Sequence, residues 1–270
     1  MECSVNGVSV HYVEYGNGTP ILMMHGSGVD HREMVGTMEP IFGDIPDYRR
    51  IYLDLPGMGR TPAPETINSS DDVVDLVLGL VDVVIGDRDL LVIGHSAGGY
   101  FARAVANRRR HQVIGLAVIC PLVEDARDIP AHQVVHAAGD LGDVLGVDDR
   151  TEFEDYFVVH TPAMQERYQR YVAPAVPLAD QGAMARIGER WRLSPGPEDG
   201  PSYPSPTLII AGRQDSSMGY ASQWDLVEHY PRASFAVLDR AGHALPHEQG
   251  DLVEALITEW LRRVQEHRSA

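Results

Sequence analysis

The chain has 270 residues, 44% of them apolar, which is typical of one large domain or of one domain that carries an insertion. Its formal net charge of −17 argues against nucleic acid or an anionic membrane as a partner, because both would repel it. Two cysteines are too few for a disulfide scaffold, and the N-terminal residues do not resemble a signal peptide, so we expect a cytoplasmic protein without a membrane span.

The first predicted element is a hairpin in CSVNGVSVHYVEYG, where apolar and polar residues alternate around Asn6-Gly7. Short apolar runs typical of buried strands follow at Ile21–Met24, Ile51–Leu53, Leu90–Ile93, Ile114–Ile119, Thr207–Ala211 and Phe235–Leu238. Helical spacing separates several of them, as at Val73, Leu76, Leu80 and Val84, with Ser70 and Asp71 placed to cap that helix. The alternation predicts an α/β fold with a mostly parallel sheet covered on both faces.

The interval from about Leu122 to Pro206 breaks this alternation, because it lacks a strand pattern and has helical spacing instead. Its three stripes are Phe153, Tyr156, Phe157 and His160, then Met164, Tyr168, Tyr171 and Val172, then Met184, Ile187 and Trp191. We predict a helical cap at 122–206, inserted into a core formed by 1–121 and 207–270. Each stripe could be an ordinary core face, but ligand sites favour such seams, so we expect at least one stripe to meet substrate.

The segment LLVIGHSAGGYFARAV places a G-x-S-x-G motif between a predicted strand and a predicted helix. This is the pattern of a nucleophile elbow, in which a serine occupies a strained turn at the end of a sheet. Gly94, Gly98 and Gly99 give the backbone room around Ser96. The motif therefore predicts that Ser96 is a catalytic nucleophile.

Four further segments extend this pattern: MMHGSG (23–28), LDLPGMGRT (53–61), AGRQDSSMG (211–219) and DRAGHALPHE (239–248). With them the chain resembles the α/β-hydrolase superfamily along essentially its whole length. The resemblance implies an eight-stranded, doubly wound sheet with an antiparallel N-terminal hairpin and a helical cap. It also implies catalysis by Ser96, Asp215 and His243, in the chain order that this fold uses. The backbone N–H groups of Ser27 and Ala97 would form the oxyanion hole.

Other residues compete for these roles. His25, His95 and His247 are alternatives to His243 as the base, although His25 and His95 belong to loop motifs and are expected to shape turns. Glu124 and Asp125 are alternatives to Asp215, because some relatives place the acid after that earlier strand. Asp54 is expected to hold its own turn together.

A serine nucleophile favours cleavage of a small ester, lactone or thioester through an acyl-enzyme, or of a carbon–carbon bond. The alternatives are a lyase or perhydrolase on the same fold, or a receptor-like protein that binds a ligand. The candidate substrate-binding residues are Gly26, His95, Tyr156, Phe157, Tyr168 and Trp191, and their aromatic rings favour an apolar or aromatic acyl compound. No cofactor or metal signature is found, and the cap helices could form a homodimer surface as easily as a lid.

Overall fold

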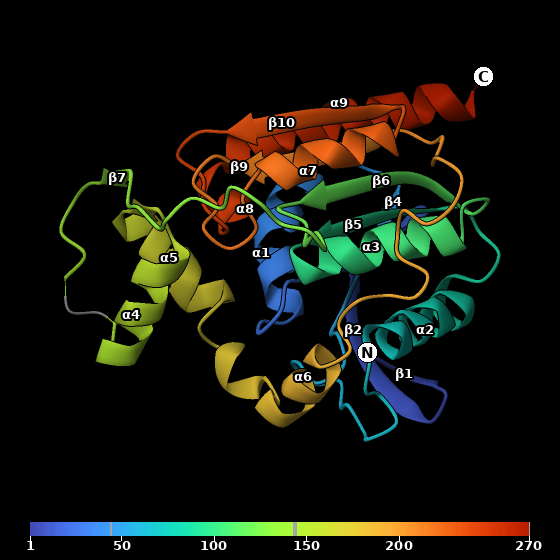
Figure 1. Ribbon diagram of the computed structural model, residues 1–270, viewed down its shortest axis with the longest axis horizontal. Coiled ribbons are helices and arrows are strands. Elements are labelled where there is room, and N and C mark those ends of the chain that lie inside the picture. The colour runs from blue at the N-terminus through green and yellow to red at the C-terminus, as the bar shows by residue number, and fades with distance from the viewer. Residues whose placement is uncertain (44, 143–144, 270) are drawn as a thin grey trace.

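The computed structural model describes residues 1–43, 45–142 and 145–269 and is built around an eight-stranded sheet (Figure 1). The sheet order is β1-β2-β4-β3-β5-β6-β9-β10, with β2 antiparallel to β1 and to β4 and all other neighbours parallel. The strands are β1 (Glu2–Val5), β2 (Val8–Tyr15), β3 (Thr19–Met24), β4 (Tyr48–Leu53), β5 (Leu90–His95), β6 (Val113–Ile119), β9 (Thr207–Gly212) and β10 (Ala233–Leu238). The prediction of a mostly parallel sheet is confirmed. Residues 44, 143, 144 and 270, which belong to the predicted core and cap ranges, lie outside the described residues.

The N-terminal hairpin turns at Asn6 and Gly7, as predicted. Asn6 has a φ of +50° and Gly7 one of +84°, the left-handed region that a two-residue hairpin turn requires. Val5 and Val8 pair directly across this turn. The hairpin forms one edge of the sheet, because β2 continues into the pairing with β4.

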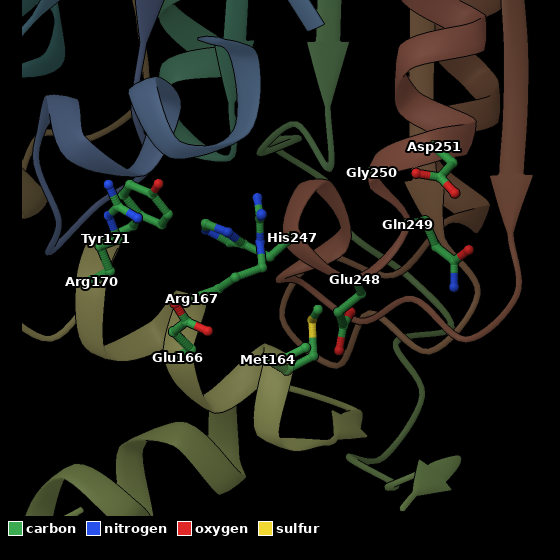
Figure 2. A pocket seen from close by; sticks show the side chains of 11 residues that line it. Met164, Glu166, Arg167, Arg170, Tyr171, His247, Glu248, Gln249, Gly250 and Asp251 are labelled. Atoms are coloured by element: carbon green, nitrogen blue, oxygen red, sulfur yellow. The ribbon is translucent and has the colours of Figure 1, made fainter. Parts of the chain in front are cut away.

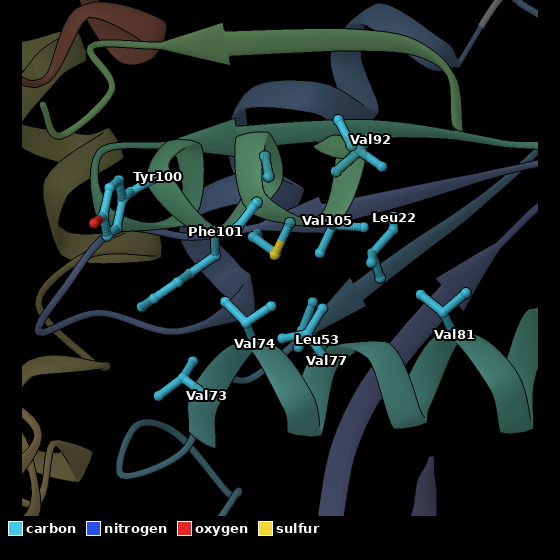
Figure 3. Close-up of a cluster of buried hydrophobic side chains, with 14 of the residues drawn as sticks. Leu22, Leu53, Val73, Val74, Val77, Val81, Val92, Tyr100, Phe101 and Val105 are labelled. Carbon is cyan, nitrogen blue, oxygen red and sulfur yellow. The ribbon is translucent and has the colours of Figure 1, made fainter. Parts of the chain in front are cut away.

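Helices cover both faces of the sheet. On one face Ile21, Met23 and Trp260 belong to one buried cluster. On the other face Leu22 and Val92 belong to a second cluster, which Figure 3 shows between the strands and two helices. Successive strand residues point to opposite faces, so a strand buried on both sides is apolar throughout. The helices of these layers are α1 (His31–Phe42), α2 (Ser70–Leu80), α3 (Ala97–Arg108), α7 (Ala221–Asp225), α8 (Leu245–Glu248) and α9 (Gly250–Arg268), with a short π-helix η1 (Val81–Ile85) and a 3₁₀ helix η3 (Leu226–Glu228).

The start of α2 corrects one detail of the prediction, because its N-cap is Ser69 rather than Ser70 or Asp71. Ser69 has an extended backbone, and its hydroxyl accepts a hydrogen bond from the Asp72 N–H at 3.2 Å. The same hydroxyl donates to the Asp72 carboxylate at 2.7 Å. Ser70 already lies inside the helix, where its side chain does not cap the first turn.

Residues 122–206, which we call the insertion segment, connect β6 to β9 and lie mostly to one side of the sheet (Figure 1). All three predicted helical stripes extend past the end of a helix. Phe157 and His160 lie beyond the end of α4, Val172 follows the end of α5, and Trp191 lies beyond the end of α6. Two short strands also occur that the sequence did not suggest. The elements of the segment are β7 (His136–Ala137), α4 (Val147–Tyr156), β8 (Val159–His160), α5 (Pro162–Tyr171), η2 (Val176–Leu178) and α6 (Gln181–Gly188).

The end of α4 has a physical cause in a carboxylate from another part of the chain. Glu248 Oε1 accepts hydrogen bonds from the N–H groups of Val158, at 2.6 Å, and Val159, at 3.0 Å. Its other oxygen accepts from the Gly242 N–H at 2.7 Å. Burial raises the pKa of Glu248 to about 7 despite these three donors. Glu248 thus ties the insertion segment to the loop that precedes α8.

No helix among the described residues is long and apolar enough to cross a membrane.

The largest fully buried side chain, Trp260, gives a test of this core. Its indole N–H donates to the Pro206 carbonyl at 3.0 Å. Trp260→Ala should lower the free energy of unfolding by about 3–5 kcal/mol, because it leaves a large cavity and removes one of the two hydrogen bonds to the Pro206 carbonyl. Urea unfolding followed by far-UV circular dichroism measures this. Trp224→Ala is the matched control, since Trp224 is 57% exposed and should cost far less. Equal losses in both variants would contradict the assigned core.

Candidate active site

Ser96 occupies the turn between β5 and α3 with a strained backbone, at φ +52° and ψ −120°. Two glycines permit the close packing around it. A Cβ added to Gly98 would lie 2.3 Å from the Met24 carbonyl oxygen, and one added to Gly94 would lie 2.2 Å from the Gly98 carbonyl oxygen. Any side chain at these positions would therefore push α3 away from the strands beneath it.

The structure brings Ser96, His243 and Asp215 together. His243, in the loop after β10, has its Nε2 2.8 Å from Ser96 Oγ, although 147 residues separate the two. The His243 Nδ1 lies 3.0 and 3.1 Å from the carboxylate oxygens of Asp215, which follows β9. This geometry suits proton transfer from the serine hydroxyl to the imidazole, with the carboxylate holding the ring in orientation.

Asp215 is fully buried, and its surroundings keep it ionised. One carboxylate oxygen accepts hydrogen bonds from the N–H groups of Ser217 and Met218, each at 2.9 Å. Burial alone would raise the pKa of Asp215. The charge and hydrogen bond of His243, together with the two N–H donors, outweigh burial and lower it.

Ser27, in the loop after β3, lines the same cavity as Ser96, and Ala97 follows Ser96 as the first residue of α3. Within the described part of the chain neither backbone N–H has a hydrogen-bond acceptor. Two unpaired N–H groups beside a serine are the feature that an oxyanion hole requires.

Glu33, in the first turn of α1, is a site residue that the sequence analysis missed. Its carboxylate lies 3.0 Å from His95 Nδ1 and accepts hydrogen bonds from the Gly26 N–H at 2.9 Å and the Tyr156 hydroxyl at 3.0 Å. The other ring nitrogen of His95 lies 2.9 Å from the carbonyl oxygen of His243. Glu33 therefore links the loop before Ser27, the insertion segment and the His243 loop.

The electrostatics of this pair are those of a buried ion pair. Glu33 and His95 are each 1% exposed. Burial would raise the pKa of Glu33 and lower that of His95, but their mutual attraction reverses both shifts. The sequence offered one weak signal, an acidic residue next to the inward-facing Met34.

Two cavities meet at Ser27, and one of them is lined by Ser96. The nucleophile cavity, of about 220 Å³, is lined by Ser96, His243, Glu33, Glu152, Tyr156 and Tyr168 among others. The apolar cavity, of about 170 Å³, is lined by Ala97, Phe101, Leu122, Met184, Ile187 and Trp191 among others.

Five of the six predicted substrate-binding residues line these cavities, and they are Gly26, His95, Tyr156, Tyr168 and Trp191. Phe157 lines neither one. It is fully buried and packs against the rings of Phe153 and His247 instead.

A larger cavity, of about 480 Å³, lies between α5 and the start of α9 and is not lined by Ser96. Figure 2 shows Arg167 and His247 on one side of this arginine cavity and Gln249 and Asp251 on the other. His247 is buried, and neither ring nitrogen has a partner among the described residues. Burial, followed by the charge of Arg167, lowers the pKa of His247 to about 3. His247 does not line the cavity of Ser96.

The remaining alternatives to the predicted catalytic residues, and Asp54, have structural contacts of their own. His25 Nε2 accepts a hydrogen bond from the Leu55 N–H at 2.9 Å. Asp54 accepts hydrogen bonds from the N–H groups of His31 and Arg60, each at 2.9 Å, within its turn. Glu124 accepts a hydrogen bond from the Tyr100 hydroxyl, and the Asp125 side chain is 91% exposed.

Two groups of side chains within the described residues could hold a metal ion. One consists of His95, Cys120 and His243, and the other of His11, His31 and Asp54. A metal in the first group would compete with the proton-transfer geometry of His243.

The ion pair of Glu33 gives a prediction about stability. Glu33→Gln should lower the free energy of unfolding at pH 7 by about 3–5 kcal/mol, because it leaves His95 without its buried counter-charge. The folded-state pKa of Glu33 lies below its ordinary value of 4.5, so this stabilisation is present above pH 4.5 and is lost as the pH falls. Urea unfolding at pH 7 and pH 3.5 measures both effects.

The matched control for Glu33→Gln is Glu254→Gln, at an exposed position on α9. The control should change the free energy of unfolding by less than about 0.5 kcal/mol. If Glu33→Gln behaves like this control at pH 7, the ion pair does not stabilise the fold.

Comparisons with known proteins agree with this architecture. A family model described as "Alpha/beta hydrolase family" matches residues 21–256. A hydrolase of 2-hydroxy-6-oxo-6-(2'-aminophenyl)hexa-2,4-dienoic acid from Metapseudomonas resinovorans is 23% identical over 99% of this chain and 92% of its own length. The 2-hydroxymuconate semialdehyde hydrolase of Pseudomonas sp. (strain CF600) is 25% identical over 94% of this chain and 91% of its own length.

Among solved structures, an alpha/beta superfamily hydrolase from Oenococcus oeni PSU-1 superposes with a TM-score of 0.89 at 26% identity. The superposition covers 98% of this chain and 99% of that one. The family model covers most of the chain, and the structural match extends over nearly all of it. The chain belongs to the alpha/beta hydrolase family.

Proposed function

We propose that this hydrolase cleaves small esters, lactones or thioesters, with Ser96 as the nucleophile. The observation that carries the proposal is the contact of 2.8 Å between Ser96 Oγ and His243 Nε2, with Asp215 at the opposite ring nitrogen. A serine hydroxyl is a weak nucleophile at neutral pH and needs such a base.

In this mechanism His243 takes the proton of Ser96 as the hydroxyl oxygen attacks the substrate carbonyl. Asp215 keeps the Nδ1 proton in place and stabilises the imidazolium that forms. His243 then gives its proton to the leaving group, and the substrate acyl group is left on Ser96. A water molecule, activated by the same imidazole, releases the acid product.

The tetrahedral intermediate carries a negative oxygen that needs hydrogen-bond donors. The N–H groups of Ser27 and Ala97 supply them in this proposal, supported by their lack of other acceptors within the described residues. The N-terminus of α3 also directs its positive dipole end toward this oxygen. Losing one such donor costs about 2.7–4 kcal/mol of transition-state stabilisation.

We assign the insertion segment the role of a cap over Ser96. Its residues Tyr156 and Tyr168 line the nucleophile cavity, and Met184, Ile187 and Trp191 line the apolar cavity. The small volume and apolar lining of the second cavity favour a short or aromatic substituent over a long chain.

Cleavage of a carbon–carbon bond is a second candidate, which the comparisons favour. The two relatives reported above are named as hydrolases of a dienoic acid and of a semialdehyde, and both match more than 90% of this chain. The same serine, histidine and oxyanion donors would serve that reaction. Loss of absorbance of a 2-hydroxy-6-oxo-dienoic acid would detect it.

Turnover of p-nitrophenyl butyrate by wild type, Ser96→Ala and His243→Ala tests the ester proposal. Removing the nucleophile or the base should lower turnover by a factor on the order of 10⁴ to 10⁶. Ser202→Ala and His132→Ala are the matched controls, because both lie on the surface away from the site. Near wild-type turnover in Ser96→Ala would rule out Ser96 as the nucleophile.

A further inference from the structure

We infer that the site selects uncharged or cationic esters over those that carry a carboxylate near the scissile bond. The same preference disfavours the carboxylate-bearing dienoic acids of the second candidate reaction. This inference rests on the proposed function and names its substrate class. It follows from the charges that line the two cavities beside Ser96.

The nucleophile cavity is lined by two carboxylates, and only one of them has a cationic partner. Its carboxylates are Glu33 and Glu152, and among the described residues that line either cavity none is lysine or arginine. The charge of Glu33 is matched by His95, which lies 3.0 Å away. Asp215, directly behind His243, adds a further buried negative charge.

Glu152 is the carboxylate of this lining that no described basic group neutralises. It projects from α4, and its Oε2 accepts a hydrogen bond from the Tyr168 hydroxyl at 2.9 Å. This contact holds the charge in place without cancelling it. No described lysine, arginine or histidine lies within ion-pair distance of Glu152.

Arg150, the cation nearest to Glu152 in sequence, donates a hydrogen bond to the Gly142 carbonyl at 2.8 Å. The two arginines of α5 face another space. Arg167 and Arg170, on α5, line the arginine cavity together with His247 (Figure 2). That cavity and the nucleophile cavity share no lining residue. A substrate carboxylate beside Ser96 would therefore meet Glu152 and the protein's overall negative charge without a compensating guanidinium.

Two series of esters test this inference. In each series matched members carry a trimethylammonium group, a neutral tert-butyl group or a carboxylate, placed on the acyl chain in one series and on the alcohol in the other. We expect kcat/KM for the anionic member to be about tenfold or more below that of the neutral member in both series at low salt. This difference in kcat/KM should decrease as salt is added, because salt screens the charges.

Glu152→Gln keeps an acceptor for the Tyr168 hydroxyl but removes the charge. This substitution should reduce the ratio of kcat/KM between the neutral and anionic esters about threefold or more in at least one series. That series is the one whose charged part enters the nucleophile cavity. Glu154→Gln is the matched control, since both glutamates are exposed on the same helix and only Glu152 lines a cavity. Anionic esters turned over as well as neutral ones, or equal ratios of kcat/KM in the two variants, would overturn the inference.

Binding separates this inference from the proposed function. Ser96→Ala cannot form an acyl-enzyme, so calorimetric titration of this variant with the same esters measures charge preference alone. If wild type cleaves none of the esters, the proposed function fails, and the titration still decides the inference. Tighter binding of the neutral and cationic members upholds it, and equal binding of all three contradicts it.

Discussion

The close packing of α3 against the central strands is the constraint on which the site depends. Gly98 allows the start of this helix to rest on the carbonyl oxygen of Met24, at the end of β3. The loop that follows β3 is thereby brought beside the turn that follows β5, so Ser27 and Ala97 line one cavity. A methyl group at Gly98 would separate them and move Ser96 with the helix. The elbow is thus a product of backbone proximity as much as of the serine itself.

Much of the fold and of the candidate site could be predicted from the sequence, because the sequence signals involved are local. Asn6-Gly7, the apolar strands and the G-x-S-x-G turn each report on a few neighbouring residues, and the chain order of the motifs then suggested Asp215 and His243. The misplaced end of α4 shows where local signals fail. Helical spacing continues through Phe157 and His160, but the backbone there hydrogen-bonds to Glu248, some 90 residues later in the chain. No short-range pattern encodes that contact.

Glu33 could not be predicted for the same reason, since its contacts come from distant parts of the chain. Its three neighbours, Gly26, His95 and Tyr156, come from a loop, a strand end and the insertion segment. A buried carboxylate is costly unless its partners all arrive together, so this arrangement favours one relative placement of those parts over others. Glu248 does the same just after the end of α4, where it binds Val158 and Val159. These two carboxylates thus attach the insertion segment to the core.

Glu248 also has a consequence for how the chain matures. It follows the whole insertion segment in sequence, as do Asp215 and His243. The ribosome releases β1 to β6 and Ser96 before the insertion segment, because synthesis runs from the N-terminus. Asp215, His243 and Glu248 leave the ribosome only after that segment. In the nascent chain Ser96 therefore lacks its contact with His243, and the insertion segment lacks its contact with Glu248, until the C-terminal part of the chain docks.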